Sequence, residues 1–324
     1  MMRAFAIDGH RLKAVQQPPE DLAGLVWVDL LEPSEAEDKA VERWIGAGIP
    51  SRDEMNEIEA SSRLYSRNDV NFMTAILPEH SDSDHPTLLP VTFVLAGDKL
   101  VTVRYHEPAS FKTFPETALN SDLECADALA IMIGLLEAIV ERMADLLESL
   151  NEHVIDLSRT IFHPREKNAY KRGQKFQIVL RGIGRKEGMI TGLQESLVTL
   201  QRLTGFLIHV SLGWKDRGQE REKMKTIARD IKSLLGHAEM LSQKIAFLLD
   251  ATLGMINIEQ NGIMQIVSVA TVVFLPPTLV ASIYGMNFDL MPELHWRIGY
   301  PLALIAMAAA AVIPFWYFKR KGWL

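Results

Sequence analysis

The pattern of hydrophobic and polar positions is most distinctive near the C-terminal end of the chain. No Asp, Glu, Lys or Arg occurs from Gln260 to Phe288, and none occurs from Ile298 to Phe318. A helix of about 20 predominantly apolar residues crosses the hydrocarbon core of a bilayer. The pattern therefore predicts two membrane spans, at about 262–283 and at 298–318, with residues 284–297 as a loop at one membrane face.

The chain before these spans has a helical period. Within residues 121–216, apolar residues recur at steps of three and four, which predicts an antiparallel pair of long helices broken at Pro164. The same stepping runs from Met224 to Leu253 without a breaker. Residues 217–283 are therefore expected to form one stalk helix that continues into the first span, about 100 Å long at 1.5 Å per residue.

Residues 1–120 have a different pattern. Short β-rich runs such as GLVWVDL and KLVTVRYH are bounded by Gly, Pro and Asp, which predicts an α/β domain. Charged residues make up 23% of the chain, so a large soluble part accompanies the spans. The expected fold is an α/β cytosolic domain, a long α-helical stalk and a two-helix transmembrane hairpin.

Composition excludes several classes of protein. The formal net charge of −7 argues against nucleic acid as the main partner, because phosphate binding favours basic surfaces. Cys125 is the single cysteine, so neither an intrachain disulfide nor a cysteine zinc cluster is possible. The chain lacks a phosphate-binding glycine loop, a His-Glu-x-x-His motif and a nucleophile elbow. We therefore expect no enzyme and no organic cofactor; a membrane-tethered scaffold stays open as an alternative.

The charges that flank the spans predict the topology. The tail, residues 319–324, contains Lys319, Arg320 and Lys321. The connecting loop carries Asp289, Glu293 and Arg297. Positive-inside bias then places both termini in the cytoplasm and the loop outside. The N-terminal residues lack the apolar core of a signal peptide.

One face of the first span is mostly polar or small. At steps of three and four it carries Asn261, Met264, Ser268, Thr271, Leu275, Thr278 and Ser282. Polar residues in a span face protein or water rather than lipid. The stripe either lines a water-filled conduit or packs against another helix, since Ser and Thr are frequent at membrane helix interfaces. One helix cannot enclose a conduit, so the first alternative requires several copies around an axis.

The loop supplies a family resemblance. The sequence YGMNF, followed by MPEL, then by GYP and by the tail KRKGWL, resembles the CorA family of divalent-cation channels. The resemblance is strongest over residues 257–324. It implies a homopentameric funnel in a bacterial cytoplasmic (inner) membrane, gated from the cytosolic domain. It also implies that the stripe lines the pore and that the protein takes up Mg²⁺, with Co²⁺ and Ni²⁺ as further candidate cargo.

The resemblance places a selectivity filter at Gly285, Met286 and Asn287, supported by Tyr284 and Phe288. Mg²⁺ sheds its water reluctantly. A ring of neutral Asn287 side-chain oxygens would bind the hydration shell without stripping it and would still release the ion. Asp289 and Glu293 are either an outer acidic vestibule or solvated loop charges.

A regulatory metal site is harder to place. In CorA-like channels acidic residues between cytosolic domains bind Mg²⁺ and hold the pore closed when the ion is plentiful. By offset from the loop motif the stalk acid of that site falls on Thr226, with Asp230 one turn later. Its partner is expected near Glu79, Asp82 and Asp84, which cluster with His80 and His85. The departure at Thr226 and the histidines leave another alternative open: a zinc transporter of the related ZntB branch, with or without proton coupling.

Overall fold

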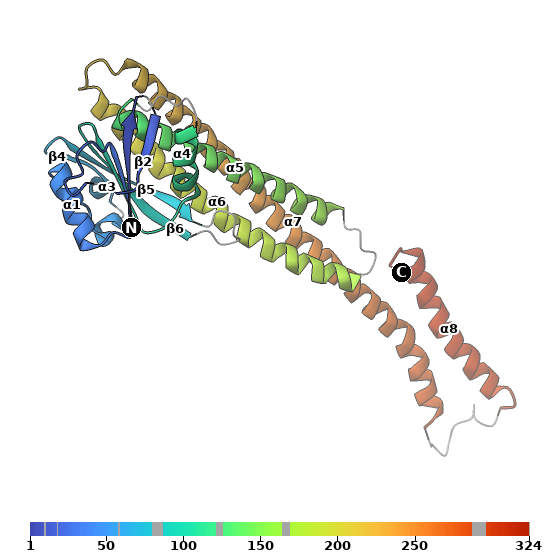
Figure 1. Ribbon diagram of the computed structural model, residues 1–324. Coiled ribbons are helices and arrows are strands. Elements are labelled where there is room, and N and C mark those ends of the chain that lie inside the picture. The colour runs from blue at the N-terminus through green and yellow to red at the C-terminus, as the bar shows by residue number, and fades with distance from the viewer. Residues whose placement is uncertain are drawn as a thin grey trace. The chain divides into compact units, whose positions relative to one another are not determined.

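The computed structural model describes residues 1–9, 11–17, 19–57, 59–79, 87–120, 126–163, 169–286 and 296–323. Figure 1 shows the helices and strands that these residues form. They divide into two compact units. Unit 1 comprises Met1–His163 and Val179–Leu249. Unit 2 comprises Pro164–Ile178 and Asp250–Leu324.

Unit 1 contains a 7-stranded sheet with the order β2-β1-β3-β7-β6-β5-β4. The strands are β1 (Met2–Asp8), β2 (Arg11–Val15), β3 (Trp27–Leu31), β4 (Leu64–Arg67), β5 (Val70–Glu79), β6 (Thr87–Ala96) and β7 (Lys99–Arg104). Only β3 and β7 pair in parallel among these strands, with Asp29 opposite Thr102. The N-terminal α/β prediction is thereby confirmed.

Three helices follow β3: α1 (Glu35–Ile45), α2 (Arg52–Met55) and α3 (Ala60–Arg63). Ser34 and Glu37 form a capping box at the start of α1, and Ser51 and Glu54 form another at α2. Val41 and Ile45 of α1 join one hydrophobic core with the sheet residues Val28, Leu30, Val101 and Val103. Because side chains alternate along a strand, Trp27, Asp29 and Thr102 face the other side.

That second face is covered by α4 (Ala109–Asn120), α5 (Ala128–Phe162) and α6 (Ala169–Ser211). Trp27 stacks on Phe5 at 4.5 Å between ring centroids and also contacts Phe114 of α4. Gly192 lets α6 approach β6, because a Cβ there would lie 2.9 Å from Cδ1 of Leu88. The long helices therefore pack directly on the sheet.

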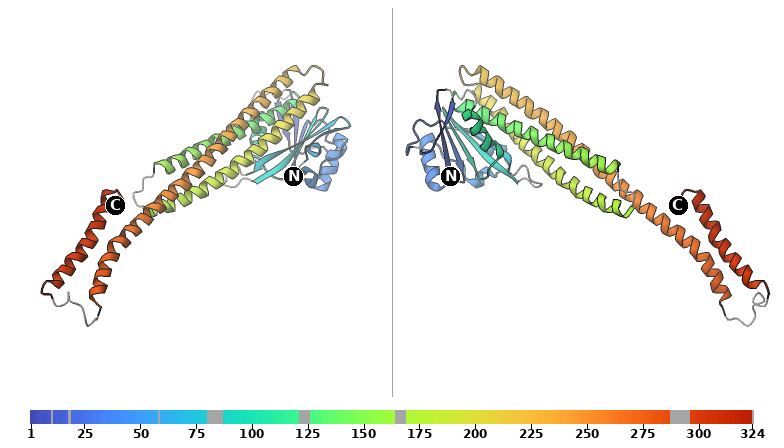
Figure 2. Two further views of the ribbon diagram at one scale, coloured as in Figure 1. Left: turned by 180° about the vertical axis from the view of Figure 1, so that it is seen from behind. Right: turned by 45° about the vertical axis from the view of Figure 1, so that its right-hand side comes forward.

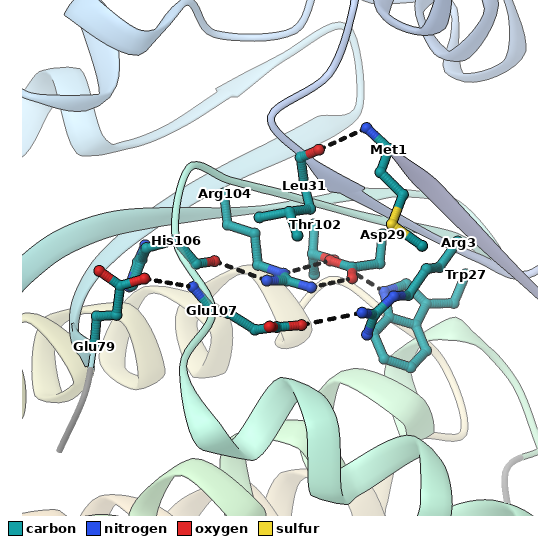
Figure 3. A network of polar contacts seen from close by, with 10 residues as sticks. All are labelled: Met1, Arg3, Trp27, Asp29, Leu31, Glu79, Thr102, Arg104, His106 and Glu107. Carbon is teal, nitrogen blue, oxygen red and sulfur yellow. Dashed lines mark hydrogen bonds and ion pairs between the residues drawn. The ribbon is translucent and has the colours of Figure 1, made fainter. Parts of the chain in front are cut away.

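A buried ion pair lies between the sheet and these helices (Figure 3). Arg104, which is fully buried, donates two hydrogen bonds to Asp29, Nε to Oδ1 at 3.0 Å and Nη2 to Oδ2 at 2.8 Å. Thr102 donates to the same carboxylate at 2.7 Å and accepts from the indole N–H of Trp27 at 3.1 Å. Arg104 also donates to the carbonyl oxygen of His106 at 2.7 Å. The network fixes the neighbouring strands β3 and β7.

His106 is buried beside this pair. Its Nε2 lies 3.1 Å from the carbonyl oxygen of Leu77, so Nε2 carries the proton of a neutral ring. Its Nδ1 is buried and makes no hydrogen bond with the described residues. Burial lowers the pKa of His106 from 6.5 to about 4, although the nearby Glu79 carboxylate opposes this shift.

We expect His106 to weaken the fold in acid. Between the folded pKa of about 4 and the unfolded pKa of 6.5, the unfolded chain binds more protons, so stability falls as the pH falls. The loss at about pH 4.5 amounts to about 2–3 kcal/mol. His106→Gln keeps an N–H donor but does not titrate. Urea unfolding at about pH 7 and about pH 4.5 should therefore show a smaller pH dependence for this variant than for the wild type; equal dependence would contradict the assignment.

Two further helices complete the chain: α7 (Gly218–Tyr284) and α8 (Gly299–Arg320). In unit 1, α7 buries residues at the predicted steps, among them Met224, Ile231, Ala238 and Ile245. Arg217, just before α7, pairs with Asp127, the N-cap residue of α5. Within unit 2, α8 runs in the opposite direction to the C-terminal part of α7 (Figure 2). Both helices are long and apolar enough to cross a membrane.

Candidate ion-conducting site

The C-terminal part of α7 presents the stripe that the sequence singled out. Asn261, Met264, Ser268, Thr271, Leu275, Thr278 and Ser282 are all exposed in the single chain. At 3.6 residues per turn they fall within an arc of about 100°. Even the apolar members are exposed to solvent, with an exposed fraction of 62% for Met264 and 63% for Leu275. The structure thus brings all of these residues onto one uncovered face.

Three hydroxyl groups of this stripe are oriented by the helix itself. Ser268 donates to the carbonyl oxygen of Met264 at 2.8 Å, Thr271 to that of Val267 at 3.0 Å, and Thr278 to that of Phe274 at 2.8 Å. Each hydroxyl hydrogen is thereby used within the helix. The oxygen lone pairs remain available, so these side chains act as hydrogen-bond acceptors toward whatever lies beside the stripe.

The other faces of the same helical segment are apolar apart from the exposed Gln265. The segment's exposed large side chains include Ile263, Ile266, Val267, Val272, Phe274 and Ile283. Val269 is the exception, with an exposure of 3%. Side chains of this kind suit lipid or another apolar helix. The segment therefore has one face that carries several hydrogen-bond acceptors and broad faces that are mostly apolar.

Two prolines interrupt the hydrogen bonds of this segment. Pro276 and Pro277 lie inside α7, and neither has an N–H to donate to the carbonyl oxygens of Val272 and Val273. The helix nevertheless continues to Tyr284. Non-helical hydrogen bonding at membrane depth is tolerated where protein or water contacts the freed oxygens.

The helix ends at the loop motif. The N–H of Gly285 donates to the carbonyl oxygen of Ala281 at 3.0 Å, and that of Met286 to Ile283 at 3.3 Å. Gly285 does not take a left-handed φ; a Cβ there would lie 3.1 Å from the Ala281 oxygen. Close approach to the last turn, rather than a left-handed backbone, is what favours glycine at this position.

The rest of the predicted mouth lies outside the described residues. This applies to Asn287 and Phe288 of the motif and to the outer acids Asp289 and Glu293. Asp82 and Asp84 of the candidate regulatory cluster also lie outside them, as do His80 and His85.

Within the single chain, the two described members of the regulatory candidates have different surroundings. Glu79, at the end of β5, accepts a hydrogen bond from the backbone N–H of Glu107 at 3.3 Å. Asp230 instead lines a cavity of about 410 Å³ between α5 and α7, together with Glu137 and Glu141. Within the described ranges, no three His, Cys, Asp or Glu side chains are grouped closely enough to hold a metal ion.

Sequence reasoning did not connect Glu137 and Glu141 with Asp230. The two glutamates are four residues apart on α5 and so share a helix face. Only the packing of α5 against α7 brings them to Asp230. The available signal was the spacing of four, which identifies the shared face but not the partner helix.

Comparison with known proteins agrees with this architecture. A family model described as CorA-like Mg²⁺ transporter protein matches residues 23–320. The Magnesium transport protein CorA of Yersinia pseudotuberculosis is 36% identical over 325 residues, which cover 100% of both chains. The CorA protein of Escherichia coli strain K12 is likewise 36% identical over 325 residues, with 100% of both chains covered.

A solved structure shares the fold of the whole chain. The CorA magnesium transporter from Methanocaldococcus jannaschii superposes with a TM-score of 0.81 at 18% identity, covering 100% of this chain and 99% of that one. Two membrane-type helices, a long-helix region and an N-terminal α/β unit therefore occur in both. With the match of the family model and the full-length identity, the chain belongs to the CorA-like Mg²⁺ transporter family.

Proposed function

We propose that this chain assembles as a homopentamer in a bacterial inner membrane and conducts Mg²⁺ into the cytoplasm. The C-terminal parts of α7 surround the axis, and α8 faces the lipid. Both termini lie in the cytoplasm, as the basic tail favours. One observation carries the proposal: the whole stripe, made mostly of hydroxyl-bearing and amide side chains with Met264 and Leu275 among them, stays uncovered along a membrane-type helix.

The hydroxyl geometry supports a hydrated cation as the cargo. Water bound to Mg²⁺ directs its hydrogens outward, and the ion keeps several of these waters when it binds to proteins. Ser268, Thr271 and Thr278 have already donated their own hydrogens to backbone oxygens. Repeated around an axis, their oxygens would accept hydrogen bonds from the hydration shell at successive levels of the pore.

The mouth is proposed to select the ion through Asn287, next to Gly285 and Met286. Tyr284 and Phe288 would position this ring, and Asp289 and Glu293 would raise the local concentration of cations. Deeper in the pore, Leu275 and Met264 form apolar rings at which the pore closes by losing its water. Closure is proposed to be controlled from unit 1, and Asp230 is the described candidate for a regulatory Mg²⁺.

The cargo assignment rests on full-length relatives. The proteins that are 36% identical over the whole chain are named for magnesium transport. The alternative of a zinc transporter has weaker support, since the ZntB cytoplasmic domain from Vibrio parahaemolyticus aligns at 9% identity over 78% of this chain. Co²⁺ and Ni²⁺ are proposed as minor cargo on the same chemistry.

The stripe can be tested at Thr271. Thr271→Val keeps the shape of the side chain but removes one ring of acceptor oxygens, so Mg²⁺ influx into liposomes should fall about tenfold. Thr160→Val is the matched control. The hydroxyl group of Thr160 on α5 makes the same kind of bond, because it donates to the backbone carbonyl oxygen of Asp156 at 2.9 Å. If Thr271→Val conducts like the control, the stripe serves helix packing and the conduit assignment fails.

A further inference from the structure

The C-terminal end of α8 carries a compact group of cations and aromatic rings, which we call the terminal cap, residues 316–323. Lys319, Arg320 and Lys321 are all exposed. Across the described part of the chain, no carboxylate forms an ion pair with any of these three. The cap follows directly on the apolar residues of α8, at the level where the headgroups of a bilayer begin.

Aromatic rings hold two of the cations in place. The guanidinium carbon of Arg320 lies 5.4 Å from the ring centroid of Trp316, and Nζ of Lys321 lies 5.3 Å from that of Tyr317. Both distances fit cation–π contacts. Both aromatic residues are largely exposed to solvent, Trp316 to 61% and Tyr317 to 52%. Each cation is therefore oriented and still has hydrogen-bond donors to offer.

The backbone beyond the helix is also ordered. Gly322 takes a left-handed φ of +74°. Its N–H donates to the carbonyl oxygen of Lys319 at 3.2 Å, and the N–H of Trp323 donates to the carbonyl oxygen of Phe318 at 3.1 Å. These two bonds are those of a Schellman motif. The ring of Trp323 accordingly returns to within 5.2 Å of Phe318. The chain turns back at this point instead of extending away, which keeps its aromatic and basic groups together.

We propose that the terminal cap binds the phosphate headgroup of an anionic phospholipid. A phosphate accepts paired hydrogen bonds from a guanidinium and a further one from an ammonium group. Trp and Tyr side chains favour the headgroup level, where one end of the ring is apolar and the other is wet. Among the described residues these three cations have no ion-pair partner and lie next to an apolar span, which matches a ligand that has both a negative headgroup and acyl chains.

The test is a lipid titration of the purified full-length protein, followed by native mass spectrometry. Phosphatidylglycerol should bind more tightly than phosphatidylcholine. Since each surface cation contributes about a fivefold gain in affinity, Arg320→Gln with Lys321→Gln should weaken phosphatidylglycerol binding about 25-fold. Arg297→Gln is the matched control: it lies two residues before α8 begins, at the end remote from the cap, and should change the affinity by less than about twofold because charges beyond a Debye length are screened.

A second pair of variants separates the rings from the net charge. Trp316→Leu keeps all three cations but removes the face beneath Arg320, so the affinity should fall about twofold to fivefold, and Trp316→Phe should restore part of it. Equal binding of the two lipids, or an equal loss in Arg297→Gln, would overturn the proposal. Inorganic phosphate that competes as well as the lipid would also overturn it in favour of a free anion site. If the cap variants lose their oligomeric state but still bind phosphatidylglycerol as the wild type does, the proposal is overturned in favour of a contact between copies of the chain.

Discussion

Replacing Asn287 by Ala is expected to reduce Mg²⁺ influx about 100-fold or more. The proposed ring of amide oxygens binds the water shell of the ion, and the loss of two hydrogen bonds to a charged species is sufficient for an effect of this size. The methyl group of Ala offers no acceptor in their place. The measurement is the initial rate of Mg²⁺ influx into liposomes that contain equal amounts of each variant.

The control for this experiment is Asn151→Ala. Asn151 is an asparagine on α5 in unit 1, outside the proposed stripe and the predicted spans, so its loss should leave the rate unchanged. The oligomeric state of each variant should match that of the wild type in size-exclusion chromatography. Normal influx through a correctly assembled Asn287→Ala protein would remove Asn287 from the filter.

The second large effect is expected in the stability of unit 1. Asp29→Ala leaves the guanidinium of Arg104 buried without its carboxylate and deprives the Thr102 hydroxyl of its acceptor. Removal of one partner from a buried pair costs about 3–5 kcal/mol in the free energy of unfolding. Urea unfolding followed by tryptophan fluorescence measures this loss, since Trp27 belongs to the same network.

An exposed ion pair provides the comparison. Asp8 and Lys13 lie 3.2 Å apart, with side chains 72% and 66% exposed. Asp8→Ala should therefore cost at most about 1 kcal/mol. The double variant Asp29→Leu with Arg104→Met removes both charges and should recover most of the lost stability. A cost for Asp29→Ala no larger than that for Asp8→Ala would contradict the assigned role of the pair.

The helical part of the fold was largely predictable from the sequence. The three-four stepping of apolar residues marks the buried side of α7, and the absence of charge marks the segments that suit a membrane. The stripe from Asn261 to Ser282 was predictable for the same reason, because a period of 3.6 places such residues on one face. These signals are local, so they do not depend on knowledge of the partner elements.

Contacts between distant segments were not predictable in this way. Asp29 and Arg104 are 75 positions apart, and they meet because β3 pairs in parallel with β7. Strand order depends on how the whole sheet forms, which a single strand's pattern does not encode. Asp230 similarly meets Glu137 and Glu141 only through helix packing. The predicted link between Asp230 and the acids near Glu79 used sequence offsets alone, and the described residues keep Asp230 and Glu79 in different surroundings.

The central claim, conduction of Mg²⁺ driven by the membrane potential, is tested most directly with the wild-type protein in liposomes. A divalent ion gains about 4.6 kcal/mol for each 100 mV of inside-negative potential. Mg²⁺ influx should therefore rise with an imposed potassium diffusion potential and should not respond to a pH gradient. Absence of Mg²⁺ influx, together with Zn²⁺ influx that follows the pH gradient, would contradict the claim and favour the zinc alternative.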